Sequence, residues 1–213
     1  MACLAGGGRI ALLTSVYFQC AGASGIATDL AGPTANLVLA GMCCLFLRAK
    51  NLSRNVRLFL ALSLAINLFW MAGTMLDSAI MGRSDFAYLL RTTLIGQHPG
   101  SRIGLAFLGV LIYAWSLRAA ARHAPAGTRF GVAYISMGIV SCSAALFYAG
   151  PTLPALKGAA LESFGAMVGL LLLSVRAHGG AKALPVHLTG RLARVCGTAL
   201  VVFWATLGIG ISH

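Results

Sequence analysis

Long runs of apolar residues separated by short polar and basic segments make up most of the chain. Six of these runs approach or reach the length of a membrane-crossing helix, at about residues 31–47, 58–81, 103–121, 130–150, 157–175 and 195–211. A bilayer core about 30 Å thick needs about 20 mainly apolar residues per helix. The pattern therefore predicts an all-α integral membrane protein, a polytopic bundle of about six transmembrane helices.

The first 30 residues form a small-residue segment whose form the pattern leaves open. Residues 10–28 are apolar but contain several polar residues and glycines. Three interpretations remain: a weak first membrane helix, a signal sequence with Ala21-Gly22-Ala23 as its cleavage site, or a strand-like re-entrant segment. The re-entrant interpretation depends on the β-branched and aromatic residues between Ile10 and Gln19.

The composition also indicates a membrane environment. Apolar residues make up 59% of the chain and charged residues only 9%, with a mean hydropathy of +0.87. A soluble domain of this size carries roughly 25% charged residues. No linker rich in serine, proline or charge divides the sequence, so we expect residues 1–213 to form a single transmembrane domain.

The formal net charge of +12 comes mainly from the connections between the predicted helices. The connections at 48–57, 118–129 and 176–194 hold eleven Lys or Arg residues, whereas the opposite ones hold four. This asymmetry predicts that the three basic loops are cytoplasmic, that the C-terminus is outside, and that the membrane is a bacterial-type inner membrane. We expect anionic lipid headgroups as partners and no nucleic acid, because no basic stripe or nucleic-acid-binding fold is present.

Carboxylates are scarce and fall at related places along the chain. The only acidic residues are Asp29, Asp77, Asp85 and Glu162, and the predicted topology puts all four toward the non-cytoplasmic side. Two interpretations follow: a polar pocket for a proton, a cation or a metal, or structural pairing of each acid with a nearby cation. The cations in question are Arg83, Arg91, Arg102 and Lys157.

Two predicted helices carry polar residues that need partners inside a membrane. Pro33 suits the first turn of the helix at 31–47, Asp29 precedes that helix, and Asn36 falls one turn inside it. In the helix at 157–175, Glu162 shares a face with three glycines, Gly158, Gly165 and Gly169, which allow close backbone approach. The candidate intramembrane site residues are therefore Asn36, Asp77, Glu162 and Asp29.

The segment Ala31-Gly32-Pro33-Thr34-Ala35-Asn36-Leu37 resembles the Gly-Pro-x-x-Asn helix of site-2-protease-like intramembrane zinc metalloproteases. In that family the helix follows a zinc-binding H-E-x-x-H helix and a Gly-rich, partly strand-like segment, which residues 3–10 resemble. The resemblance implies that Asn36 lies near the reaction centre. It also implies an aspartate zinc ligand from a later helix, for which Asp77 is the first candidate and Asp85 the second.

The sequence contains no H-E-x-x-H motif, so no catalytic residue is assigned and no cofactor is evident. Zinc is expected only if the chain is N-terminally truncated and a zinc helix precedes it. We therefore expect a truncated or degenerate metalloprotease-like protein that is not catalytic by itself. Two alternatives remain, namely a non-enzymatic subunit or assembly factor with a membrane-protein partner, and a small proton- or cation-coupled transporter using Asp77 and Glu162.

Overall fold

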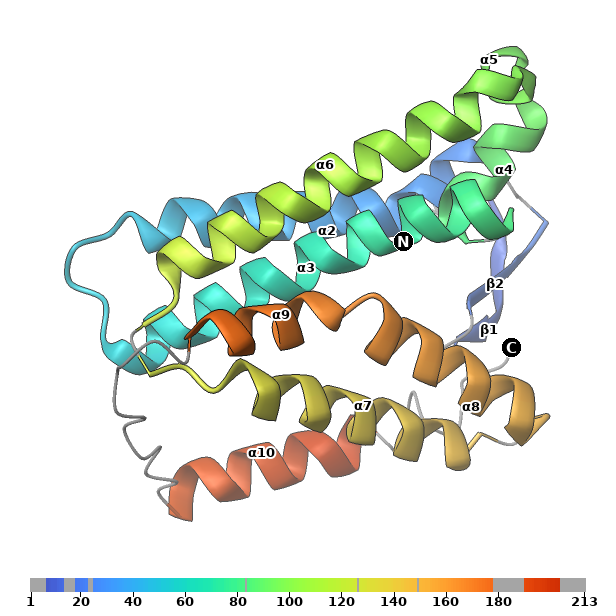
Figure 1. Ribbon diagram of the computed structural model, residues 1–213. Coiled ribbons are helices and arrows are strands. Elements are labelled where there is room, and N and C mark those ends of the chain that lie inside the picture. The colour runs from blue at the N-terminus through green and yellow to red at the C-terminus, as the bar shows by residue number, and fades with distance from the viewer. Residues whose placement is uncertain are drawn as a thin grey trace.

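The computed structural model describes residues 7–13, 18–22, 25–82, 84–125, 127–148, 150–177 and 190–203. Within these ranges the chain is helical apart from one short hairpin of two strands, β1 (Arg9–Leu13) and β2 (Phe18–Ala21) (Figure 1). The helices are α2 (Ile26–Leu47), α3 (Arg54–Met81), α4 (Asp85–Thr92), α5 (Leu94–Gln97), α6 (Pro99–His123), α7 (Phe130–Leu146), α8 (Thr152–Ala160), the π-helix η1 (Leu161–Gly165), α9 (Val168–Ala177) and α10 (Gly190–Phe203).

Four helical segments are long and apolar enough to cross a bilayer, which supports the predicted transmembrane helices. They are Asp29–Leu47, Arg54–Met81, Pro99–His123 and Thr152–Ser174, the last of which comprises α8, η1 and most of α9. The apolar helix α7 is shorter, with 17 residues. The predicted span at 195–211 falls partly outside the described residues. A total of about six spans therefore stays a prediction.

Large apolar side chains cover the outside of the bundle. Phe59, Ile103 and Leu153 expose 69%, 73% and 78% of their surface. Exposure of so many large apolar side chains is unusual for a soluble monomer. Lipid chains are the solvent that such a surface requires.

The hairpin precedes α2 and is antiparallel, with Arg9 opposite Ala21 and Leu13 opposite Phe18. The register shifts between Ile10 and Leu12, which marks a bulge or irregularity. The described parts of the predicted N-terminal segment before α2 are thus strands rather than a helix. Whether this hairpin enters the bilayer as a re-entrant segment stays a prediction, and residues 1–6 and 14–17 lie outside the described residues.

The first helix begins earlier than predicted. It starts at Ile26, so Asp29 lies within its first turn and Pro33 lies inside the helix. The predicted placement of Pro33 in the first turn is therefore wrong. Proline has no N–H, so the Asp29 carbonyl lacks its usual donor four residues later. The carboxylate of Asp29 still lies where the helix dipole favours negative charge.

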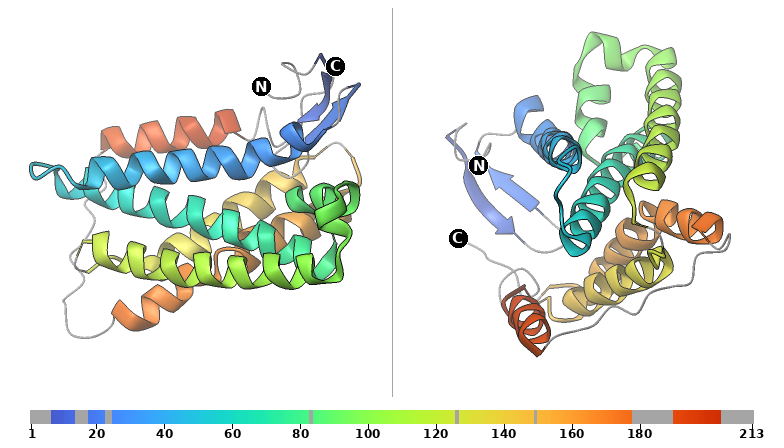
Figure 2. Two further views of the ribbon diagram at one scale, coloured as in Figure 1. Left: turned by 90° about the horizontal axis from the view of Figure 1, so that it is seen from above. Right: turned by 90° about the vertical axis from the view of Figure 1, so that its left-hand side faces the viewer.

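Helix α3 is the central element of the bundle, and it packs against both α2 and α6 (Figure 2). Ser53 caps its start, because the Ser53 hydroxyl accepts a hydrogen bond from the Val56 N–H at 3.4 Å. Gly82 ends it in the left-handed conformation at φ 66°, which glycine adopts without the steric cost of a Cβ. The chain then turns directly into α4.

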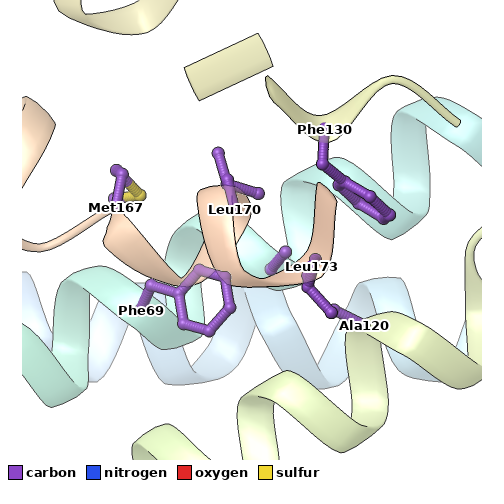
Figure 3. Packing of buried hydrophobic residues seen from close by; sticks show 7 residues of the cluster. Phe69, Ala120, Phe130, Met167, Leu170 and Leu173 are labelled. Carbon is purple, nitrogen blue, oxygen red and sulfur yellow. The ribbon is translucent and has the colours of Figure 1, made fainter. Parts of the chain in front are cut away.

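The main hydrophobic core lies where α3 meets α6, α7 and α9 (Figure 3). Phe69, Met167 and Leu170 have no exposed surface, and Phe130 and Leu173 close the cluster. The Phe69 ring packs against the Tyr113 ring with centroids 4.9 Å apart. This cluster holds the two halves of the chain together.

The predicted helix at 157–175 differs from the structure in two respects. It begins five residues earlier, at Thr152, because Pro154 is tolerated in a first helical turn. It is also interrupted by η1 and by a turn at residues 166–167. Tyr113 from α6 compensates for the break, since its hydroxyl donates to the Ala166 carbonyl at 3.1 Å and accepts from the Gly169 N–H at 2.6 Å.

Candidate functional site

Three of the four carboxylates lie in parts of α2, α3 and α4 near the end of the bundle that carries the hairpin, α4 and α5 (Figure 1), and Glu162 lies near the middle of the span Thr152–Ser174. Asp29 is in the first turn of α2, Asp77 is near the end of α3, and Asp85 begins α4. Glu162 lies in η1. The loops at 48–53 and 124–129 lie at the opposite end, so the described basic loops and the acids are separated along the bundle.

Asp85 is the carboxylate that lies beside the Gly-Pro motif of α2. A Cβ atom added to Gly32 would lie 3.6 Å from Asp85 Oδ2. Burial, assisted by the negative charge of Asp29, raises the pKa of Asp85 to about 6. The carboxyl of Asp85 is therefore a group that exchanges its proton close to neutral pH.

Glu162 belongs to the same group of acids. It is half-buried, and the negative charges of Asp85 and Asp77 both act on its carboxylate. Its position in η1 is unusual, because π-helical turns are rare and are frequently found at functional sites. Asp77, Asp85 and Glu162 come from three different elements, and the charges of the two aspartates reach Glu162.

The turn between α3 and α4 fixes Asp77 and Asp85 relative to each other. The Ser84 hydroxyl donates to Asp77 Oδ2 at 2.7 Å, and the Phe86 N–H donates to the buried Ser78 hydroxyl at 3.1 Å. Ser84 has a φ of 71°, a left-handed conformation that is uncommon for residues other than glycine. The hydrogen bond to Asp77 compensates for part of this conformational cost.

Two of the cations predicted to pair with the acids lie at the C-terminus of α3. The Arg91 guanidinium donates to the Gly82 carbonyl, and the Arg102 guanidinium lies 3.6 Å from the Cβ position of Gly82. Positive charge is favoured there by the helix dipole. In the described part of the chain, the structure records no ion pair between a cation and Asp85 or Glu162. Arg83 lies outside the described residues.

The remaining predicted site residue, Asn36, is half-buried two turns further along α2 than Asp29. Among the described residues, no group of three His, Cys, Asp or Glu side chains could hold a metal ion. These residues alone therefore do not fit a zinc site. Sequence reasoning ranked Asp77 ahead of Asp85 as the candidate aspartate ligand from a later helix, and the only sequence signal for Asp85 was its place in the polar connection after α3.

The raised pKa of Asp85 leads to a pH-dependent prediction for Asp85→Asn. The folded-state pKa of about 6 exceeds the ordinary value of 3.8, so the folded protein binds this proton more tightly than the unfolded chain. Protonation of Asp85 therefore stabilises the folded protein. This stabilisation is complete below about pH 4 and is lost as the pH rises through about 6. The neutral variant should therefore unfold about 2–4 °C higher than wild type at about pH 7.5, a modest gain because Asp85 is partly solvated.

Thermal unfolding in detergent at several pH values measures this difference. It should vanish near pH 4, where wild-type Asp85 is itself neutral. Asp29→Asn is the control, since removal of its charge should move the pH midpoint of the effect downward. A difference between Asp85→Asn and wild type that is the same at both ends of the pH range would contradict the assignment.

No known protein family, curated protein or solved structure matches the chain.

Proposed function

We propose that the chain is a site-2-protease-like membrane protein that is not a peptidase by itself. The proposal is supported by the order of its elements, in which a strand pair is followed by α2 with the Gly-Pro-x-x-Asn segment and then by α3 with Asp77 near its end. The observation that carries it is the proximity of this segment to an acid, because a Cβ atom at Gly32 would lie 3.6 Å from Asp85 Oδ2.

In this proposal, Asp85 and Asp77 form the carboxylate side of a polar site next to α2. The two acids come from the adjacent elements α3 and α4, and the Ser84 hydroxyl donates to Asp77 between them. The histidines and the general base of the family motif are missing from residues 1–213. Hydrolysis would require an H-E-x-x-H helix contributed by a segment outside these residues.

Zinc content tests this proposal. We expect purified residues 1–213 to retain no stoichiometric zinc after dialysis, as measured by elemental analysis. If the reading frame upstream of Met1 encodes an H-E-x-x-H helix, the extended chain should hold about one zinc ion. Asp85→Asn or Asp77→Asn should then lower that zinc content, since loss of a ligand weakens the site. Asn36→Ala, which removes no carboxylate, is the matched control.

The possible results separate the versions of the proposal. Stoichiometric zinc in residues 1–213 alone would contradict it, because the chain would then contain a complete site. An upstream frame without H-E-x-x-H would remove the catalytic version and leave a non-catalytic relative. Unchanged zinc content in both aspartate variants of an extended chain would remove the role given to α3 and α4.

A further inference from the structure

A groove of about 370 Å³ lies on the outer face of the bundle, over α3 and between α2 and α6. Figure 2 shows how these three helices are arranged. Leu37, Leu45 and Trp115 line it, and all three are about half exposed or more. Its volume is within the range of ligand sites, about 300–1,000 Å³. Arg48 is the only charged residue in this apolar lining.

The length of the groove matches one leaflet of a bilayer. Leu37 and Arg48 are eleven residues apart along α2 and its C-cap, about three turns, which corresponds to about 16 Å at 1.5 Å per residue. Half of a hydrocarbon core about 30 Å thick is about 15 Å. An acyl chain that enters at Arg48 therefore reaches roughly the bilayer midplane at Leu37.

The charge at one end of the groove lies at headgroup depth. Arg48 follows the apolar span Asp29–Leu47 directly, so its guanidinium is at the edge of the hydrocarbon. Ala119 of α6 packs against the cluster that contains Leu47, which puts the exposed Arg118 and Arg122 at a similar depth. Cationic charge at this depth attracts a phosphate group.

We propose that this groove binds one anionic phospholipid, with an acyl chain lying over α3 between α2 and α6 and its phosphate against Arg48. The apolar lining with a single cation at one end matches the two parts of such a lipid, an apolar chain and an anionic headgroup. The proposal is independent of the function proposed for the opposite end of the bundle.

Fluorescence quenching of Trp115 tests the proposal in the full chain. Trp70 and Trp204 are replaced by phenylalanine, so that Trp115 is the only tryptophan. The protein is reconstituted in phosphatidylcholine bilayers that contain increasing fractions of either phosphatidylglycerol or phosphatidylcholine brominated on the acyl chains. Because Arg48 makes one favourable contact with an anionic headgroup, brominated phosphatidylglycerol should reach half-maximal quenching of Trp115 at a mole fraction about fivefold lower than that of brominated phosphatidylcholine.

Two substitutions with matched controls locate the site. Arg48→Gln should abolish the anionic preference, whereas Arg129→Gln, at an exposed cation of the same end outside the groove, should leave it unchanged. Gly41→Leu should fill the groove and remove the preference, because no atom lies within 4 Å of its Cβ position. Gly104→Leu, at an equally open helical glycine on α6, should not.

Each remaining result overturns the proposal. Equal quenching by the two brominated lipids means that only ordinary boundary lipid contacts Trp115. Equal loss of preference in Arg48→Gln and Arg129→Gln means that diffuse surface charge attracts the lipid. The absence of quenching by either lipid means that another protein segment covers the groove.

Discussion

Replacing Gly169 with leucine should destabilise the folded protein by about 3 kcal/mol, in the upper part of the range for overpacked cores. A Cβ atom added at Gly169 would lie 2.5 Å from Cζ of Phe69. The Phe69 ring cannot move away easily, because it is fully buried and packs against the Tyr113 ring. Helix α9 would have to separate from α3, which would open the main core.

Thermal or denaturant unfolding in detergent measures this loss. Gly104→Leu is the matched control, since it introduces the same side chain at a helical glycine whose Cβ position has no atom within 4 Å. That variant should be neutral or slightly stabilising, because leucine has the higher helix propensity. Equal destabilisation by both variants would contradict the packing of α9 against α3.

Tyr113→Phe removes a single oxygen atom and should lower the free energy of unfolding by about 2–4 kcal/mol. The break after η1 leaves the Ala166 carbonyl and the Gly169 N–H to be satisfied by the Tyr113 hydroxyl. Removal of this hydroxyl leaves one acceptor and one donor of the backbone in an apolar environment, at about 1–3 kcal/mol for each unsatisfied group. The same unfolding measurement reports the change, and faster hydrogen exchange at the Gly169 amide should accompany it.

Tyr134→Phe is the natural comparison for this substitution. The Tyr134 hydroxyl donates to the Phe164 carbonyl at 3.3 Å, and its ring packs edge-on against Phe164. Loss of the Tyr134 hydroxyl removes one hydrogen bond, which is longer than those of Tyr113, and leaves no backbone N–H without an acceptor. The free energy of unfolding should therefore fall by about 1 kcal/mol. A cost for Tyr134→Phe that equals or exceeds that of Tyr113→Phe would contradict the role assigned to Tyr113.

Helix positions and the end at which Asp29 and Asp77 lie follow from the apolar pattern. A chain with short connections reverses direction after each long helix, so the end that a residue occupies depends on how many helices precede it. This reasoning placed Asp29, Asp77 and Glu162 toward one end. Asp29 lies in the first turn of α2 and Asp77 near the end of α3, but the last of these spans begins at Thr152, which puts Glu162 near its middle.

Which residues share a helix face with Glu162 could not be predicted by counting helices. A period of 3.6 residues puts Gly165 and Gly169 on one close-packed face with Glu162. In the structure Gly169 packs tightly against Phe69, whereas the Cβ position of Gly165 meets no atom within 4 Å. The wider turns of η1 change the register between them, and no local sequence pattern announces a π-helix.

The proximity of Asp85 to Gly32 also depends on geometry that the sequence does not specify. The left-handed conformations of Gly82 and Ser84 set the direction in which α4 leaves α3. Position in the chain alone made Asp77 the better candidate. In addition, the helix containing Pro33 extends back to Ile26, although proline disfavours a helical conformation in the residue before it.

The separation of acids from most of the cations gives this molecule a permanent electrical polarity along its helices. A potential difference of 100 mV corresponds to about 2.3 kcal/mol for each elementary charge carried across the bilayer. In an energised membrane, the orientation with the arginine-rich end on the negative side therefore has the lower electrostatic energy.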